Sequence, residues 1–194
     1  MKLSRGKRLI ILGVLLVVVD QVVKYLVKTN MTLGQQIPVL GQWFRICFIE
    51  NEGMAFGMKF GGVAGKYFLS VFRICLCVAL VWWISSLNKK GKAPVGVLVG
   101  LTLITAGAFG NIIDSMFYGL IFSESTTSTL AVLGGSYAPF LQGKVVDMLY
   151  FPIIRSGERV IFFSPVFNIA DSCVTVGAFY LILFQWKFFS KESR

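Results

Sequence analysis

The sequence predicts a mainly α-helical membrane protein, a bundle of four transmembrane helices with a small antiparallel β-sheet on the extracytoplasmic side. Four apolar stretches each have the length of about 20 residues that a helix needs to cross a bilayer. Only 14% of the residues are charged and 56% are hydrophobic, which is too apolar for the surface of a soluble domain. Two long connecting segments contain β-like runs. We expect residues 1–194 to form a single membrane domain.

The four expected spans follow one another along the chain. They cover approximately Leu9–Val27, Tyr67–Leu87, Pro94–Asp114 and Val166–Phe189. The first span follows basic residues, as a signal peptide would. No small-x-small cleavage site follows it, and Asp20 and Lys24 interrupt its end, so we expect it to be retained.

The basic residues indicate the orientation of the chain. The N-terminal tail, the short connection between the second and third spans and the C-terminal end hold ten of the nineteen Lys and Arg residues, with Glu192 as their only acid. The positive-inside rule therefore places both termini in the cytoplasm and the two long segments outside. The net charge of +10 is explained by topology and contact with membrane lipids, so no nucleic-acid partner is expected.

The two outer segments, residues 28–65 and 115–165, supply the expected sheet. In the first, Trp43–Ile49 is aromatic and β-branched, which favours a strand. Asn51-Glu52-Gly53 ends that run, and the glycine-rich piece Gly57–Gly65 suits the membrane surface.

In the second outer segment, Lys144–Ile154 and Arg159–Phe163 have a β-like pattern, with Ser156-Gly157 as a turn between them. Ser123–Gly143 is rich in Ser, Thr and Gly, which is typical of a mobile loop. The alternative is that the aromatic residues only anchor the loops at the level of the lipid headgroups.

The residue types limit the chemistry. The chain has no histidine, which removes the commonest neutral metal ligand and the commonest general base. Its four cysteines show no metal-binding spacing and suit small apolar positions. We therefore expect no metal and no cofactor.

The four aspartates, Asp20, Asp114, Asp147 and Asp171, all fall near the outer ends of spans or next to a strand. A charged residue within a membrane is costly and is a functional hypothesis by default. Four aspartates at about the same depth in the membrane predict a shared site. The alternative is polar helix packing, with Lys24 offsetting Asp20 four residues earlier.

Two amide and carboxyl pairs share one spacing. Asn111 and Asp114 are three residues apart, as are Asn168 and Asp171, so each pair would share a helix face. Two close carboxyls favour one proton between them, which provides both a general base and a general acid without a metal. This pattern predicts a carboxylate dyad for hydrolysis.

Three other interpretations remain open on spacing alone. A Ser–Lys protease would use Lys24 with Ser164 or Ser172. A proton-coupled transporter would use the acids as a relay, but it would place them near the bilayer centre. A non-catalytic scaffold would use the polar residues only for helix packing.

Five short motifs in order resemble the type II signal peptidases of bacteria, the lipoprotein signal peptidase family. They are D-Q-V-V-K at Asp20–Lys24, N-E-G-M-A-F at Asn51–Phe56, G-A-F-G-N-I-I-D at Gly107–Asp114, V-V-D at Val145–Asp147 and F-N-I-A-D at Phe167–Asp171. Each motif is short, but together they cover most of the chain.

The resemblance implies an intramembrane aspartyl endopeptidase of the bacterial inner membrane. It would act as a monomer on diacylglyceryl-modified prolipoproteins and cut before the lipidated cysteine, near the outer leaflet. The implied catalytic pair is Asp147 and Asp171. The implied supporting residues are Asp20, Lys24, Asn51, Gly53, Asn111, Asp114 and Asn168.

The chain departs from the family pattern in two places. Ser115 stands where the family usually has Arg, so Asp114 lacks a local charge partner, and Arg73 or Lys144 are candidate substitutes. The segment between Asp114 and Asp147 is long, and Ser123–Gly143 reads as an insertion. We expect it to be a plain surface loop, with a substrate lid as the alternative.

Overall fold

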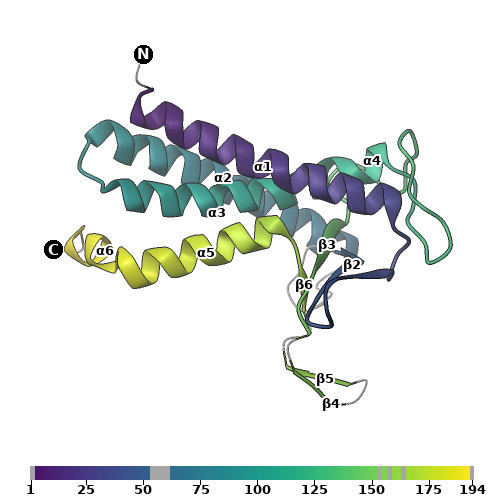
Figure 1. Ribbon diagram of the computed structural model, residues 1–194. Coiled ribbons are helices and arrows are strands. Elements are labelled where there is room, and N and C mark those ends of the chain that lie inside the picture. Colours follow the sequence, from purple (N-terminus) through teal and green to yellow (C-terminus); the bar gives the residue numbers. More distant parts are fainter. Residues whose placement is uncertain (1–2, 53–61, 153, 157–158, 163–164, 193–194) are drawn as a thin grey trace. The chain divides into compact units, whose positions relative to one another are not determined.

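The computed structural model in Figure 1 describes residues 3–52, 62–152, 154–156, 159–162 and 165–192. Its elements, in chain order, are α1 (Arg5–Asn30), β1 (Gln36–Leu40), β2 (Phe44–Asn51), α2 (Gly62–Lys90), α3 (Val95–Ile113), the π-helix η2 (Asp114–Tyr118), α4 (Gly119–Ile121), β3 (Val145–Tyr150), β4 (Ile154–Ser156), β5 (Arg159–Phe162), β6 (Val166–Phe167), α5 (Ile169–Phe184) and α6 (Trp186–Glu192).

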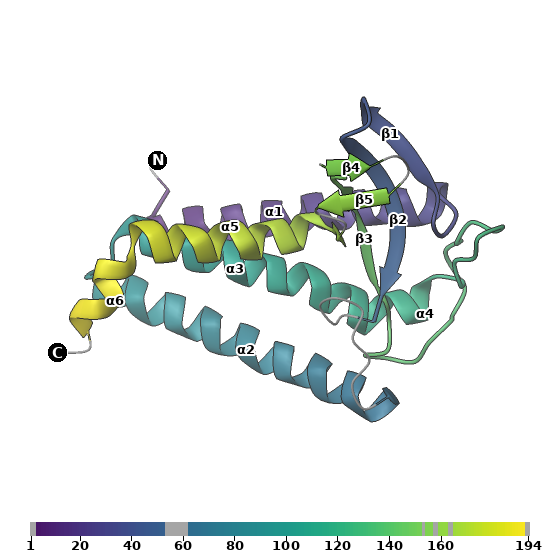
Figure 2. The same cartoon turned by 90° about the horizontal axis from the view of Figure 1, so that it is seen from below.

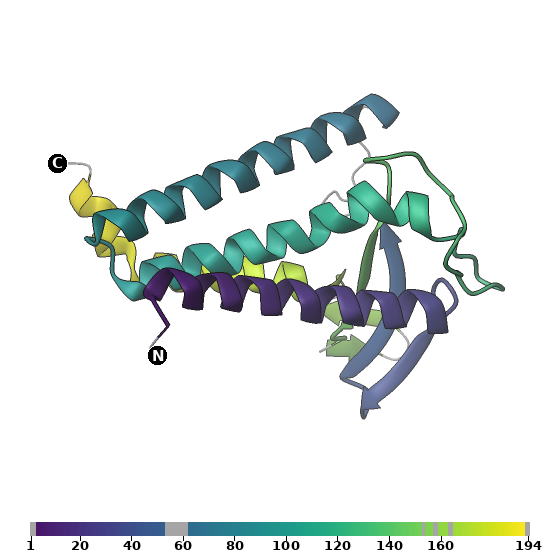
Figure 3. The same cartoon turned by 90° about the horizontal axis from the view of Figure 1, so that it is seen from above.

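The chain divides into two compact units. The helical unit comprises Met1–Asp20, Val71–Gly110 and Ile169–Arg194, and the sheet unit comprises Gln21–Ser70 and Asn111–Asn168. Helices α1, α2 and α3 each contribute residues to both units, and Figure 3 shows α1 as one continuous helix. That the chain acts as a single membrane domain stays a prediction.

The helical unit has an aliphatic core. Its buried residues are Leu9, Leu87, Ala93, Val97, Leu98, Leu101 and Leu181. Arg5 joins the start of α1 to the α2–α3 connection, because its Nε donates to Asn88 Oδ1 at 2.8 Å and its Nη1 donates to the Ala93 carbonyl at 3.2 Å. Large apolar side chains on the outward faces, such as Val78 and Trp82 of α2, are exposed, as a lipid-facing surface requires.

Three of the described helices are long and apolar enough to cross a membrane: Arg5–Asn30, Gly62–Lys90 and Val95–Ile121. The third extends past Asp114, the predicted end of its span, because apolar residues continue through η2 and α4. The fourth expected span is shorter than predicted. Helix α5 has 16 residues, about 24 Å, against a hydrocarbon core of about 30 Å, and four crossings therefore stay a prediction.

The sheet unit contains the predicted antiparallel sheet, whose strand order is β1-β2-β3-β6 (Figure 2). The runs Trp43–Ile49 and Lys144–Ile154 correspond to β2 and β3, and Arg159–Phe163 corresponds to β5, which pairs with β4. Strand β1 was not predicted from the sequence. The core of the unit is Val27, Met31, Phe48, Tyr118, Phe122, Val146 and Met148.

A bulge in β2 sets which side chains share a face with Asp147. Ile46 pairs with Leu149, whereas Ile49 pairs with Asp147, so β2 has one extra residue between these pairs. Bulges re-aim the side chains that follow them. Beyond the bulge, Ile49 and Asn51 share the face of Asp147, and Glu50 lies on the opposite face with Val146.

Residues 122–144, which we call the strap, connect α4 to β3. Apart from one isolated bridge between Phe122 and Leu133, the strap has no regular structure, as predicted for a loop. Its backbone is nevertheless tied to neighbouring elements: Tyr137 N donates to the Gly119 carbonyl at 2.8 Å, and Ser70 Oγ donates to the Leu141 carbonyl at 3.1 Å. The strap is therefore a packed part of the sheet unit.

Candidate active site

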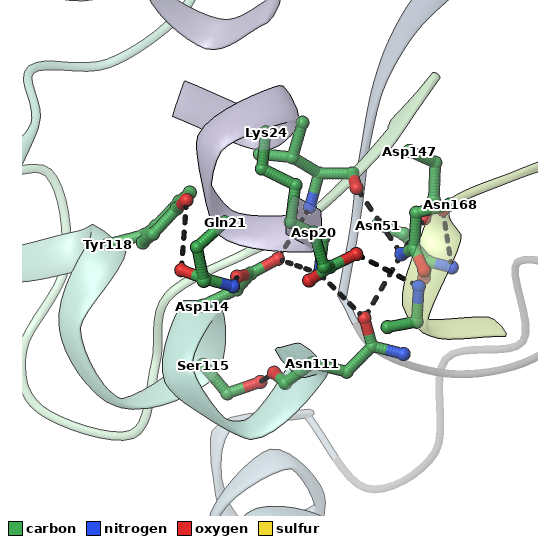
Figure 4. Close-up of polar contacts among 12 residues, drawn as sticks. Asp20, Gln21, Lys24, Asn51, Asn111, Asp114, Ser115, Tyr118, Asp147 and Asn168 are labelled. Atoms are coloured by element: carbon green, nitrogen blue, oxygen red, sulfur yellow. Dashed lines mark hydrogen bonds and ion pairs between the residues drawn. The ribbon is translucent and has the colours of Figure 1, made fainter. Parts of the chain in front are cut away.

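Asp147 lies in the middle of the sheet unit, on β3, and is 3% exposed. Asn51 Nδ2 donates to its Oδ2 at 3.3 Å, and Asn168 Nδ2 donates to its Oδ1 at 2.7 Å (Figure 4). The first contact follows from the register, because Asn51 is the diagonal neighbour of Asp147 on the same face. Two amides thus hold the two oxygens of one buried carboxyl group.

Asn168 lies between β6 and α5, one residue before the helix begins, and is fully buried. The expectation that it shares a helix face with Asp171 is therefore wrong, since Asn168 is not helical. Its amide also lies 3.0 Å from Asn111 Oδ1 and 3.3 Å from the Val146 carbonyl. Within the sheet unit, these contacts join Asn168 to the strand that carries Asp147.

Asp114, at the start of η2, is fully buried and accepts from three groups. Lys24 Nζ lies 2.8 Å from Oδ2, Gln21 Nε2 donates to Oδ1 at 2.9 Å, and Val146 N donates to Oδ2 at 3.1 Å. The carboxylate therefore binds α1 on one side and the residue before Asp147 on the other. We call these groups the Asp114 network.

Lys24 supplies a charge partner for Asp114, although Ser115 stands where the family has Arg. The ammonium of Lys24 contacts Asp114 and also donates to Asn111 Oδ1 at 2.9 Å, and that it offsets Asp20 stays a prediction. One ammonium reaches both side chains, so Asn111 and Asp114 share a face, as their spacing predicts. Ser115 Oγ donates to the Asn111 carbonyl at 3.1 Å, four residues earlier.

Asp20 belongs to the helical unit, where it meets the first turn of α5. Its Oδ1 accepts from Ala170 N at 2.9 Å, which places a carboxylate at a helix N-terminus, where the helix dipole favours an anion. Gly110 makes room for it, since a Cβ there would lie 2.5 Å from Asp20 Oδ2. Asp20 therefore helps fix the turn that carries Asp171.

Asp171 is half-buried in the first turn of α5. Within the helical unit it interacts electrostatically with Arg73 of α2, one of the two cations proposed as substitutes for the missing Arg. The other, Lys144, lies in the sheet unit, 3.5 Å from Glu50 Oε2 and 3.9 Å from Glu124 Oε1. Asp171 and Asp147 belong to different units, and their pairing stays a prediction.

Several predicted residues lie outside the described part of the chain. These are Gly53, Gly57–Gly61, Gly157 and Ser164. Among the residues that are described, no group of three His, Cys, Asp or Glu side chains is placed to hold a metal ion.

The sheet unit also has a cavity of about 460 Å³ next to the end of β2. It is lined by Glu52, Gly62, Val63, Lys66, Glu124, Tyr137, Ala138, Pro139, Gln142 and Lys144. Glu52 directly follows Asn51, so the cavity adjoins the strand end that contacts Asp147. Its walls combine two cations, two carboxylates and apolar side chains.

Other polar residues of the site carry no sequence-based prediction. Gln21 donates a hydrogen bond to Asp114, and Tyr118 Oη donates to Gln21 Oε1 at 3.2 Å. Lys28 forms an ion pair with Glu50. One signal was present in the sequence. Asp20, Lys24 and Lys28 recur every four residues, which places three charges on one face of an otherwise apolar helix.

Comparison with known proteins identifies the family. The model for signal peptidase II matches residues 12–187. A lipoprotein signal peptidase of Porphyromonas gingivalis is 45% identical over 94% of this chain and 84% of its own length. One of Amoebophilus asiaticus is 36% identical over 89% of this chain and 75% of its own length.

A solved structure agrees with the sequence matches. A bacterial membrane enzyme, determined by the in meso method at 2.3 Å resolution, aligns with a TM-score of 0.67 and 28% identity over 95% of this chain and 91% of the other. The matched family region contains every motif from Asp20 to Asp171. The chain belongs to the signal peptidase II family, a family of membrane proteases.

Proposed function

We propose that this protein is an intramembrane aspartyl endopeptidase that removes signal peptides from diacylglyceryl-modified prolipoproteins, cutting before the lipidated cysteine. The family supports the peptidase class, and relatives named lipoprotein signal peptidases support the substrate class. One observation carries the aspartyl assignment: Asp147 is buried, and the amides of Asn51 and Asn168, from distant parts of the chain, hold its two oxygens.

Asp147 and Asp171 act as the catalytic dyad. One carboxyl is ionised and takes a proton from water, and the water oxygen attacks the carbonyl carbon of the scissile peptide bond. The other carboxyl is protonated and gives its proton to the carbonyl oxygen. Collapse of the tetrahedral intermediate breaks the C–N bond. The cysteine amine leaves with the proton that the first carboxyl took, and the second carboxyl takes back a proton from a hydroxyl of the intermediate. The signal peptide leaves as a carboxylic acid.

The remaining predicted residues position this dyad. Asn51 and Asn168 orient Asp147, so its carboxyl does not have to be ordered when substrate binds. Asp114, with Lys24, fixes the backbone at Val146, next to Asp147. Asp20 fixes the first turn of α5, which carries Asp171.

The reaction takes place near the outer leaflet of a bacterial cytoplasmic membrane. Apolar helices support the membrane location, and the basic residues at both termini support a cytoplasmic position for them. The protein works as a monomer, since all the groups of the proposed mechanism come from one chain.

Replacing either aspartate by asparagine tests the proposal. We expect Asp147→Asn and Asp171→Asn each to lower kcat by about a thousandfold or more, because the amide can neither accept a proton from water nor donate an acidic one. The measurement is a gel-shift assay in detergent with a diacylglyceryl-modified prolipoprotein.

The matched control is Glu124→Gln, which removes a carboxylate from a side chain that is 67% exposed and should cleave normally. Normal turnover by either aspartate variant would refute the dyad. If the wild type also fails to cleave, despite a native unfolding transition, the peptidase proposal itself is wrong.

A further inference from the structure

A second group of buried charges lies in the sheet unit, away from the residues assigned to the reaction. Lys28 of α1 is fully buried, and its ammonium pairs with Glu50 Oε1. It also donates to Ser125 Oγ at 2.9 Å, and Ser125 Oγ donates to Glu50 Oε1 at 2.8 Å. The three polar groups therefore form a closed triangle, which we call the Lys28 cluster.

Aromatic rings enclose this triangle. Lys28 Nζ lies 4.9 Å from the centroid of Tyr137, 5.4 Å from Phe122 and 6.0 Å from Phe48. The electron-rich faces of such rings attract a cation, more strongly when it is desolvated. Ser125, Phe122 and Tyr137 all belong to the strap, so the strap supplies most of the surroundings of the ammonium.

Such a cluster is sensitive to the loss of any member. Breaking a buried ion pair leaves an uncompensated charge in a medium of low dielectric constant. The side chain of Glu50 is 3% exposed, and its only described cation besides Lys28 is Lys144, whose Nζ is 3.5 Å from Oε2. Glu50 is thus held in one place by α1 and by the strap.

The position of Glu50 determines that of its neighbour Asn51. The two residues lie on opposite faces of β2, and Glu50 pairs with Val146 while Asn51 pairs with Val145. Glu50 points to the cluster, and Asn51 points to Asp147, to which it donates at 3.3 Å. A shift of Glu50 therefore moves the amide that orients the Asp147 carboxyl.

We propose that Lys28, Glu50 and Ser125 are positioning residues, which act through Asn51 to hold Asp147 in its reactive orientation. The strap is then a fixed support of the active site, and neither a lid nor a dispensable surface loop. This inference rests on the proposed function. It assigns a task to a segment that shares no motif with the family.

Two substitutions weaken the cluster with little change of volume. Glu50→Gln removes the negative charge, and Ser125→Ala removes the hydroxyl that closes the triangle. We expect each to lower kcat by about tenfold, with KM within about twofold, because a misplaced catalytic group reduces turnover without removing a substrate contact. Glu124→Gln, in the same strap but exposed, is the matched control.

A double-mutant cycle separates positioning from a general loss of stability. If the cluster acts through Asn51, then Glu50→Gln added to Asn51→Ala lowers kcat by less than about twofold further. Independent, additive losses would overturn the proposal. So would a wild-type kcat in both single variants, or a loss explained entirely by a smaller folded fraction in thermal unfolding.

Failure of the proposed dyad and failure of the positioning role give different experimental results. If Asp147→Asn is inactive while Glu50→Gln and Ser125→Ala are normal, the proposed function stands and the positioning role fails. If Asp147→Asn is active, the proposed function itself fails. If Asn51→Ala turns over too slowly for the double-mutant cycle, the test is whether Glu50→Gln and Ser125→Ala lower kcat while leaving KM within about twofold of the wild type.

Discussion

Lys24 and Lys28 lie one turn apart on the same face of α1, and both are fully buried, but their partners differ in kind. Lys24 contacts Asp114, a carboxylate that also accepts from Gln21 and from the backbone of Val146. Lys28 contacts Glu50, whose Oε2 has no hydrogen-bond partner among the described residues. Glu50 Oε1 also accepts from Ser125, and Lys144 Nζ lies 3.5 Å from Oε2. Among the described residues, the Glu50 carboxylate thus contacts side chains, whereas Asp114 also binds a backbone amide.

This difference indicates what each ion pair does. Removing Asp114 would take a counter-charge from a buried cation and leave a strand amide without its acceptor, so its role cannot be taken over by an apolar side chain. The contacts of the Glu50 carboxylate among the described residues are with side chains, and Lys28 is the nearer of its two cations. A buried ion pair of that kind is often replaceable by neutral groups of similar shape, provided that both partners change together.

The largest expected effect is at Asp114. Asp114→Asn should lower the free energy of unfolding by about 3–5 kcal/mol, because the buried Lys24 loses a counter-charge that lies 2.8 Å from its Nζ. It should also abolish cleavage, since Val146 precedes Asp147. Reversible unfolding in mixed detergent micelles gives the first quantity, and the prolipoprotein assay gives the second. A fully stable Asp114→Asn would mean that Lys24 has another buried partner of equal strength.

Neutralising both members of each pair sharpens the comparison. Lys28→Met with Glu50→Gln should be closer to wild type in unfolding free energy than either single variant. Lys24→Met with Asp114→Leu should remain about 1–3 kcal/mol less stable than wild type, because the Val146 N–H keeps no acceptor. Equal recovery in the two double variants would show that the two ion pairs do not differ as described.

The Asp114 network was largely predictable from the sequence, and the Lys28 cluster was not. Asp114, Asn111 and Asn168 stand in short motifs, and charged residues in apolar helices are conspicuous. The sequence did not reveal that Lys24 contacts Asp114, because spacing along one helix favours the neighbour Asp20 and carries no information on contacts with another helix.

The Lys28 cluster depends on contacts between distant parts of the chain. Ser125 lies in a segment rich in Ser and Thr, where one buried hydroxyl has no local signature, and Glu50 reads as one residue of a strand. The sheet itself was predictable from the β-branched and aromatic run before Asn51. The bulge between Ile46 and Ile49, which places Asn51 on the face of Asp147, follows only from the pairing of the strands.

The strap meets the Asp114 network as well, at Gly143. A Cβ on this residue would lie 2.1 Å from the Asp114 carbonyl, and its N–H donates to the Ser115 carbonyl at 2.9 Å. Gly143→Ala must therefore displace backbone, and we expect it to cost about 1–3 kcal/mol of stability, as overpacking does. The measurement is the same unfolding experiment. Gly134→Ala, at a position with open space but a positive φ of 87°, controls for backbone strain alone.

The smallest expected effect concerns Tyr137, whose ring lies 4.9 Å from Lys28 Nζ and helps enclose the Lys28 cluster. Burial raises the pKa of Tyr137 above its ordinary value, and the Lys144 N–H that donates to its oxygen at 2.8 Å opposes this in part. Tyr137→Phe should lose that hydrogen bond and cost about 1 kcal/mol at neutral pH.

The pH dependence gives this variant a second readout. A phenol whose pKa is raised by folding binds its proton more tightly in the native state, so stability is complete below the ordinary pKa of about 10 and falls as the pH rises above it. Tyr137→Phe lacks this group, so the stability difference between wild type and variant should shrink above that pH, while the alkaline losses from the lysines cancel in the comparison. A difference that stays constant with pH would place the Tyr137 hydroxyl in contact with solvent, and the aromatic enclosure of Lys28 would then be looser than the contacts of its ring imply.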